Sequence, residues 1–128
     1  MSEVWRSIPS APGFMASDAG RIRSPLGRVL SQHDHRSGPA TIYKRVALCI
    51  PRTAARQMGV AHQSKHLVHR LVCEAFHGPA PSPAHHAAHW NDVGTDNHPG
   101  NLRWATPAEN VEDMRRNGVL HVGGRRVA

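Results

Sequence analysis

With 128 residues, the chain has the size of one small domain and leaves no room for a large cofactor-binding fold. Its 16 Lys and Arg against 9 Asp and Glu give a formal net charge of +7 at pH 7, which favours a polyanionic partner. No stretch approaches the roughly 20 apolar residues needed to cross a membrane, and the N-terminus lacks the apolar core of a signal peptide. We therefore expect an intracellular protein without membrane contact.

The positive charge is concentrated in the N-terminal half. Residues 1–60 hold nine basic and three acidic side chains, whereas residues 61–128 hold seven and six. The basic side chains are spread out instead of forming one run, so an ordinary solvated basic surface is the alternative to a phosphate-binding face. We predict phosphate contacts from five of them: Arg21, Arg23, Arg28, Lys44 and Arg45.

Short strands are predicted for the N-terminal half. Over residues 3–30, short apolar pieces alternate with Pro and Gly, which is typical of strands and tight turns. Residues 31–40 are polar, contain Gly and Pro, and predict a loop. Residues 43–50 are rich in apolar and β-branched side chains and predict a strand that Pro51 closes. Residues 53–64 carry little signal.

Two helices are predicted in the C-terminal half. The segment HLVHRLVCEAF (66–76) repeats apolar residues at helical spacing, and Gly78 with the prolines after it ends the helix. The second helix begins after Thr106, because Pro107 and Glu109 complete a capping box with this threonine. We expect it to run to about residue 117.

Two strand candidates precede the second helix. They lie around His89 and around residues 102–104, and a loop rich in Gly, Asn, Asp and Pro joins them. Together with the capped helix they predict a ββα unit that carries His89, Asn101 and Asn110. Asp113 follows Asn110 by three residues, so we expect both side chains on one face of the helix.

At these residues the sequence resembles the HNH endonucleases, in particular the phage and intron-encoded homing type. Residues 3–24 are also similar to the small module that often precedes such nuclease domains. The combination is specific, whereas a lone His or Asn would not be. The matching residues are VHRLVCEAF at 68–76, His89, DN at 96–97, NLRWAT at 101–106 and PAEN at 107–110.

The resemblance implies an α+β protein with a ββα-metal site that hydrolyses phosphodiester bonds and nicks duplex DNA. His89 matches the family's general base, a role that suits imidazole because its pKa lies near neutrality. Asn101 matches the asparagine that ties the loop and orients the histidine, and Asn110 matches a metal ligand on the helix. The implied cofactor is one divalent cation, Mg²⁺ first, with Mn²⁺, Ni²⁺ or Zn²⁺ as alternatives.

The implied partner is double-stranded DNA, with no small-molecule cofactor. A phage-encoded protein of this type would act in the cytoplasm of a bacterial host. The target sequence, the oligomeric state and the number of strands cut stay open. The implied domains are a basic β-rich DNA-binding module over 1–52, a ββα-metal nuclease domain over 64–118 and a flexible tail over 119–128.

One residue departs from the family pattern. Many members carry a carboxylate or amide just before the catalytic histidine as a second metal ligand, and Ala88 stands there. Three replacements stay open, namely Asp113 on the helix, His86 on the strand face of Ala88, or water. Asp113 would favour Mg²⁺ or Mn²⁺, whereas His86 would favour Ni²⁺, Co²⁺ or Zn²⁺.

Two other function classes compete with the nuclease. The first is a DNA-binding protein that keeps the fold but cuts weakly or not at all, for which Ala88 is the best argument. The second is a zinc-stabilised structural module. The sequence disfavours it, because no four-ligand Cys/His spacing is present and the two cysteines form no CxxC pair.

Overall fold

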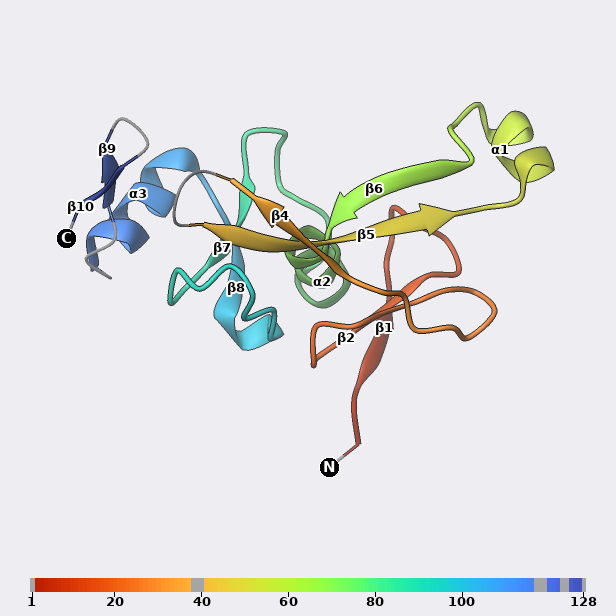
Figure 1. The fold of residues 1–128 in the computed structure, drawn as a ribbon, viewed down its shortest axis with the longest axis horizontal. Coiled ribbons are helices and arrows are strands. Elements are labelled where there is room, and N and C mark those ends of the chain that lie inside the picture. Colours follow the sequence, from red (N-terminus) through yellow and green to blue (C-terminus); the bar gives the residue numbers. More distant parts are fainter. Residues whose placement is uncertain (1, 38–40, 117–119, 123–124, 128) are drawn as a thin grey trace.

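The computed structural model describes residues 2–37, 41–116, 120–122 and 125–127. The molecule is elongated, with the helix α2 near its middle (Figure 1). The first elements along the chain are β1 (Trp5–Ser7), β2 (Met15–Ser17), β3 (Ile22–Arg23), β4 (His33–Arg36), β5 (Ile42–Cys49), α1 (Arg52–Met58) and β6 (Gln63–Leu67). They are followed by α2 (Val68–His77), β7 (His86–His89), the short 3₁₀ helix η1 (Pro99–Asn101), β8 (Leu102–Ala105), α3 (Pro107–Arg116), β9 (Leu120–Val122) and β10 (Arg125–Val127).

Two antiparallel sheets form the N-terminal half. The first has the strand order β1-β2-β3 and the second the order β4-β5-β6. The strand predicted over 43–50 is confirmed as β5, which buries Val46 and Leu48. The loop predicted over 31–40 is wrong at β4, which pairs with β5 as an edge strand. The side chains of β4 are polar and mostly exposed, so the apolar alternation that marks a strand is missing from its sequence.

The helix α2 is the centre of the hydrophobic core. It buries four apolar side chains, Val68, Leu71, Val72 and Cys73, at helical spacing. Side chains from the first sheet, from β5 and from the β7–β8 pair complete the same core, namely Ile8, Phe14, Ala16, Ile22, Val46, Leu48, Ala87 and Leu102. One core therefore joins the two predicted domains, and β6, at their predicted boundary, pairs with β5.

The predicted ββα unit follows α2. β7 pairs antiparallel with β8, which places His89 opposite Leu102. The backbone N–H of Glu109 donates to the Thr106 hydroxyl over 3.2 Å, and the Glu109 carboxylate accepts from the Thr106 N–H over 2.9 Å. These reciprocal bonds are the predicted capping box, and they fix the start of α3 at Pro107.

The last elements of the chain are the two short strands β9 and β10. β9 and β10 pair as antiparallel strands, where the sequence predicts a flexible tail.

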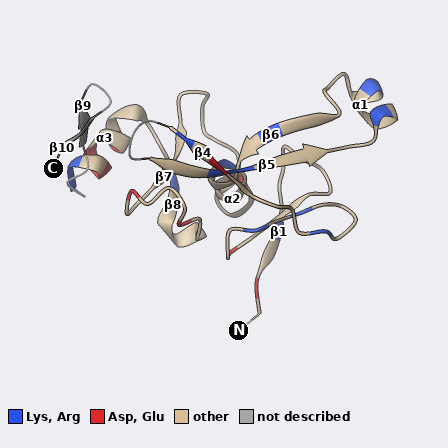
Figure 2. Cartoon of the chain, in the orientation of Figure 1, with Lys and Arg blue, Asp and Glu red and all other residues tan. Residues whose placement is uncertain are grey.

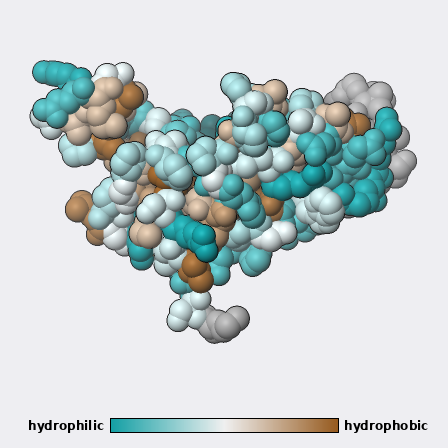
Figure 3. Space-filling view, turned by 180° about the vertical axis from the view of Figure 1, so that it is seen from behind, coloured by the Kyte–Doolittle hydropathy of each residue, from teal (hydrophilic) through white to brown (hydrophobic). Residues whose placement is uncertain are grey.

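Among the described residues, no helix has the length and apolar character needed to cross a membrane. Seen from behind, the surface is mostly hydrophilic, and hydrophobic residues are scattered over it (Figure 3).

Candidate active site

His89 ends β7 and is buried, with 6% of its surface exposed. Its Nε2 donates a hydrogen bond to Oδ1 of Asn97, 2.8 Å away in the β7–β8 loop. An amide oxygen only accepts, so Nε2 carries the proton and Nδ1 of the neutral ring keeps its lone pair. Burial lowers the pKa of His89, against the Asn97 bond and the charges of Asp92 and Asp96, which raise it. The ring is therefore neutral at pH 7, and one nitrogen can accept a proton.

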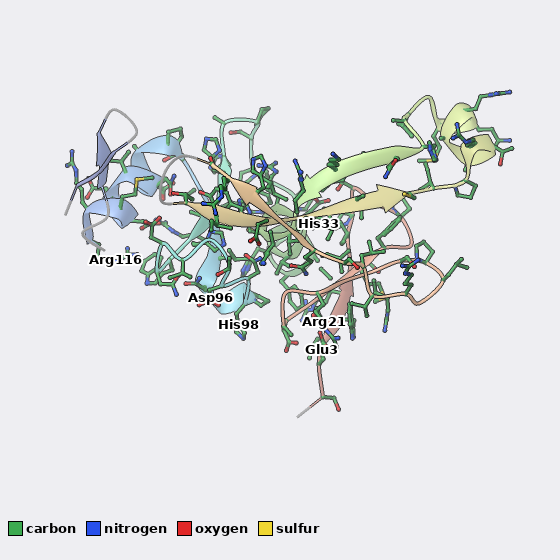
Figure 4. The ribbon with its side chains drawn as sticks, viewed as in Figure 1. Glu3, Arg21, His33, Asp96, His98 and Arg116 are labelled. Atoms are coloured by element: carbon green, nitrogen blue, oxygen red, sulfur yellow. The ribbon has the colours of Figure 1, made fainter. Side chains whose placement is uncertain are left out.

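Asn101 braces the loop that holds Asn97. Its Nδ2 donates to Oδ1 of Asn91 and to the backbone oxygen of Asp96, each at 2.9 Å. Its Oδ1 accepts from the backbone N–H of Asn91 at 3.0 Å. The loop lies beside β7 and β8, where Figure 4 labels Asp96. Asn101 thus ties both ends of the loop together, while the side-chain hydrogen bond to His89 is made by Asn97.

Two further rings pack against His89. Tyr43 from β5 and His69 from the first turn of α2 stack with their centroids 4.8 Å apart, and they lie 5.8 Å and 4.9 Å from the His89 ring. Burial, with smaller effects of the charges of His89 and Arg70, lowers the pKa of His69 to about 3. Its buried Nδ1 has no hydrogen-bond partner in the described part of the chain. His69 is therefore neutral at working pH and cannot take a proton from His89.

A cavity of about 230 Å³ lies beside this stack. β5, the start of α2, β7, the β7–β8 loop and α3 all contribute to its wall. Three predicted site residues line it, His89, Asn110 and His86, whereas Asn101 acts in the adjoining loop. The structure therefore brings together the predicted base and the predicted helix ligand.

Asp113 has a different environment from Asn110. It is 2% exposed, and its Oδ1 accepts from Arg103 at 2.8 Å and from Arg116 at 2.9 Å. The α3 residue that shares the cavity wall with Asn110 is Met114. A turn of 3.6 residues brings the fourth residue closer to the same line than the third. Asp113 does not line the cavity with Asn110, and its carboxylate bonds to two guanidinium groups instead.

The donors on the cavity wall fit a hard cation only in part. Ala88 is buried on this wall and offers no ligand. Among the residues that the structure describes, no group of three or more His, Cys, Asp or Glu side chains is placed to hold a metal ion. The wall includes Asp92 and Asn110, whose side chains carry oxygen atoms, and the exposed His86, whose ring carries nitrogen atoms. Two protein oxygens suit Mg²⁺, which completes its shell with water and phosphate oxygens.

The predicted phosphate contacts in the first sheet have partners of their own. Arg21 donates to both carboxylate oxygens of Glu3, and this bond lowers the pKa of Glu3 to about 2. Figure 4 labels Glu3 and Arg21, which lie close together. The guanidinium of Arg23 lies 4.4 Å from the centroid of the Trp5 ring. Arg28 is exposed.

The two predicted contacts in β5 lie on opposite faces of the sheet. Neighbouring residues on a strand alternate between faces, so Lys44 and Arg45 point apart. Lys44 is paired with Asp34 at 2.5 Å. Arg45 shares its face with Tyr43, and this tyrosine lines the cavity. Figure 2 shows Lys and Arg on β5, β6 and α1.

Comparisons with known proteins agree with this arrangement. Residues 66–112 match a family model described as HNH endonuclease, and residues 3–49 match the model of the NUMOD4 motif. The chain carries an HNH endonuclease domain behind a NUMOD4 motif. His89, Asn97 and Asn110 lie in the HNH domain, while Tyr43 lies in the NUMOD4 motif. Both parts therefore contribute to the wall of one cavity.

A solved structure shares the fold of the HNH domain and of the strands before it. Its description is "DNA binding and cleavage by the HNH homing endonuclease I-HmuI", and the match has a TM-score of 0.66 and 24% sequence identity. It covers 93% of this chain and 62% of that chain, so this chain spans less than two thirds of the matched protein. At this identity the likeness establishes the fold. No curated protein sequence matches the chain.

Three residues of the HNH site escape prediction from the sequence. Asn97 and His69 lie in the matching segments DN and VHRLVCEAF, so the resemblance contains them, but it assigns them no role. Asp92 gives no signal of its own. Its place on the cavity wall depends on the turn that follows His89.

Proposed function

We propose that the chain is a metal-dependent DNA endonuclease that hydrolyses a phosphodiester bond and nicks duplex DNA. The observation that carries the proposal is the hydrogen bond from His89 to Asn97 beside a cavity that Asn110 also lines. The match of residues 66–112 to the HNH endonuclease model supports this reaction class. The structural neighbour is described as a protein that binds and cleaves DNA, which supports DNA as the substrate here.

His89 acts as the general base in this proposal. Because Asn97 holds the proton of Nε2, the free Nδ1 accepts a proton from the attacking water. Burial keeps the ring unprotonated before the reaction by lowering the pKa of His89. After the transfer, the negative charges of Asp92 and Asp96 stabilise the imidazolium ion. Both acidic residues lie in the loop that Asn101 braces.

Asn110 would hold the divalent cation from α3 through its side-chain oxygen. When bound, such a cation supplies positive charge that stabilises the developing charge on the phosphate and on the leaving oxygen. The Asn101 bonds keep the loop, and with it Asn97, in position when the backbone of the substrate enters the cavity. The protein thus supplies base, orientation and one ligand from three different elements.

We place the DNA on the outer face of the β4-β5-β6 sheet. Directly paired residues share a face, so Arg45, Lys65 and His33 lie on the face of Tyr43. Phosphates bound by Arg45 and Lys65 would lead a strand toward Tyr43 and from there to His89, since these two rings border the same cavity. Binding along this face would be electrostatic and would weaken with salt.

A DNA-binding protein without cleavage activity is the second candidate function. Ala88 favours it, because the wall carries no donor at this position. The absence of a three-ligand His, Cys, Asp or Glu group within the described ranges points the same way. In this case the sheet face would bind DNA while the cavity stayed inactive.

Nicking of a supercoiled plasmid separates the two candidates. We expect the purified chain to produce nicked circles with Mg²⁺ and none with EDTA, and His89→Ala to lower the rate by about 100-fold or more. His62→Ala is the matched control, because His62 lies between α1 and β6 and does not line the cavity. Its backbone oxygen, which the substitution keeps, accepts from the backbone N–H of Ile50. Circular dichroism verifies the fold of both variants. If the wild type binds DNA but cuts with none of Mg²⁺, Mn²⁺, Ni²⁺ and Zn²⁺, the protein is the non-cleaving candidate.

A further inference from the structure

The cavity contains a carboxylate that no ligand assignment above uses, that of Asp92. We propose that Asp92 supplies the metal ligand that Ala88 cannot, so that Asp92 and Asn110 together hold the cation. The inference rests on the proposed function, because it concerns the cation of that same site. It replaces Asp113 and His86, the two protein ligands that the sequence suggests.

The position of Asp92 is fixed relative to His89. The backbone N–H of Asp92 donates to the backbone oxygen of His89 at 3.0 Å and closes a turn directly after β7. The residue is half-buried and lines the same cavity as His89 and Asn110. Its charge acts on two rings that line the cavity: it raises the pKa of His89, which burial lowers, and it adds to burial in raising the pKa of Tyr43. The carboxylate therefore lies within the electrostatic reach of the reacting groups.

The backbone of Asp92 is unusual in a way that favours a function for its side chain. Its φ is +58°, and among the described residues it is the one non-glycine residue with a positive φ. Glycine adopts this conformation without a steric penalty, and residues that keep a side chain there are concentrated at functional sites. Asp tolerates the left-handed region better than most residues. A glycine would satisfy the backbone conformation of this turn. The aspartate adds a carboxylate that the turn does not need.

The chemistry of the donors distinguishes Asp92 from its two rivals. A carboxylate and an amide oxygen are ligands that Mg²⁺ and Mn²⁺ prefer, with water and a substrate phosphate filling the remaining positions. Asp113 does not line the cavity, and its carboxylate bonds to Arg103 and Arg116. His86 offers a nitrogen, which would shift the preference toward Ni²⁺ or Zn²⁺. Asp92 is the cavity residue that restores an oxygen ligand in place of the one missing at Ala88.

Binding of Mn²⁺ to the metal-free full-length chain tests the proposal without any cleavage. Electron paramagnetic resonance counts free Mn²⁺, and titration calorimetry gives the affinity. We expect one site in the wild type and an affinity lower by about 10-fold or more in Asp92→Asn. Ala88→Asp should tighten binding and should restore it in the Asp92→Asn background. Glu112→Gln is the control for the loss of one negative charge, because Glu112 is an exposed residue of α3 that pairs with Arg115 and does not line the cavity; it should change the affinity by about twofold at most.

A second variant removes the whole side chain at a position whose backbone conformation glycine adopts readily. Asp92→Gly accepts a φ of +58°, so circular dichroism and the melting curve should show a folded protein at the temperature of the titration. Its Mn²⁺ affinity should nevertheless fall as far as that of Asp92→Asn. Loss of binding in a protein that is still folded cannot be attributed to unfolding.

Four results would overturn the proposal. These are no Mn²⁺ site in the wild type, wild-type affinity in Asp92→Asn, an equal loss in Glu112→Gln, or a loss in His86→Ala instead of Asp92→Asn. The outcome is separable from that of the proposed function. If Mn²⁺ binds through Asp92 but the protein does not nick DNA, the proposed endonuclease function is wrong and this inference stands. If the protein nicks DNA with Mg²⁺ but Asp92→Asn keeps the wild-type metal affinity, this inference is wrong and the proposed function stands.

Discussion

The Asn97 amide oxygen accepts the Nε2 proton of His89 over 2.8 Å, and this one contact decides which ring nitrogen is left for chemistry. Asn97→Ala frees the ring to rotate and to exchange its tautomers. We expect the single-turnover nicking rate to fall by about 100-fold, with unchanged DNA affinity. Asn97→Asp keeps an acceptor and should retain more activity than Asn97→Ala. Equal rates in Asn97→Ala and the wild type would show that another contact orients His89.

The pH profile of nicking should report the buried position of His89. Burial lowers its pKa, so the rate should rise with pH and level off below the ordinary histidine value of about 6.5. Removing a negative charge disfavours the protonated ring, and Asp96→Asn should therefore move the acid limb to still lower pH. Initial rates at constant ionic strength check both statements. An acid limb above pH 6.5 would contradict the assignment of the base to His89.

His69 should make the fold sensitive to acid. Its folded pKa of about 3 lies below the ordinary value of 6.5, so the unfolded chain binds the proton more readily and the free energy of unfolding falls as pH drops from 6.5 toward 3. His69→Phe removes this titration and the unpartnered Nδ1, and it should stabilise the protein by about 1–3 kcal/mol at pH 7. Urea unfolding at pH 7 and pH 4.5 measures both effects. A less stable His69→Phe would show that the nitrogen has a partner after all.

Asp113 should matter for stability and not for metal. Its buried carboxylate joins Arg103 and Arg116, so Asp113→Asn should lower the free energy of unfolding by about 1–3 kcal/mol. Its Mn²⁺ affinity should equal that of the wild type. Denaturant unfolding and Mn²⁺ titration on the same preparation separate the two roles. A loss of Mn²⁺ affinity at full stability would make Asp113 a ligand again.

Lys44 and Arg45 form a matched pair for mapping the DNA face. Arg45 lies on the face that leads to the cavity, whereas Lys44 lies on the opposite face and pairs with Asp34. Arg45→Gln should weaken DNA binding and reduce the slope of log affinity against log salt by about 1. Lys44→Gln should change the slope less. Fluorescence anisotropy with a labelled duplex at several salt concentrations gives the slopes. The reverse order would place the DNA on the other face.

The parts of the fold that the sequence predicts are those whose side chains carry a local pattern. The capping box at Thr106 and the apolar spacing of α2 locate two helices, and the β-branched run locates β5. β4 is missed because an edge strand made of polar residues has no apolar alternation to detect. α1 lies almost wholly in residues 53–64, where the pattern is weak, and β6 begins there and ends in the segment 66–76 that the sequence predicts as helix.

The candidate site follows the same rule. His89 and Asn110 can be predicted because they stand in matching segments, and the structure brings both to one cavity. The roles of Asn97 and His69 depend on contacts made across the fold, so no local spacing encodes them. Asp113 shows the opposite case, because its helical spacing from Asn110 predicts a place at the site, whereas its carboxylate bonds to Arg103 and Arg116 and does not line the cavity.

The hydrophobic core joins the NUMOD4 motif to the HNH domain. Val46 and Leu48 of β5 pack in the same core as Val68 and Val72 of α2. Replacing the N-terminal strands by those of another protein would therefore expose apolar side chains on β5 and on α2. Arg45 and Lys65 on the outer face of the sheet do not contribute to this core, because they point away from the core-facing side chains. If this face binds DNA as proposed, substitutions of Arg45 and Lys65 should alter DNA binding without disturbing the hydrophobic core.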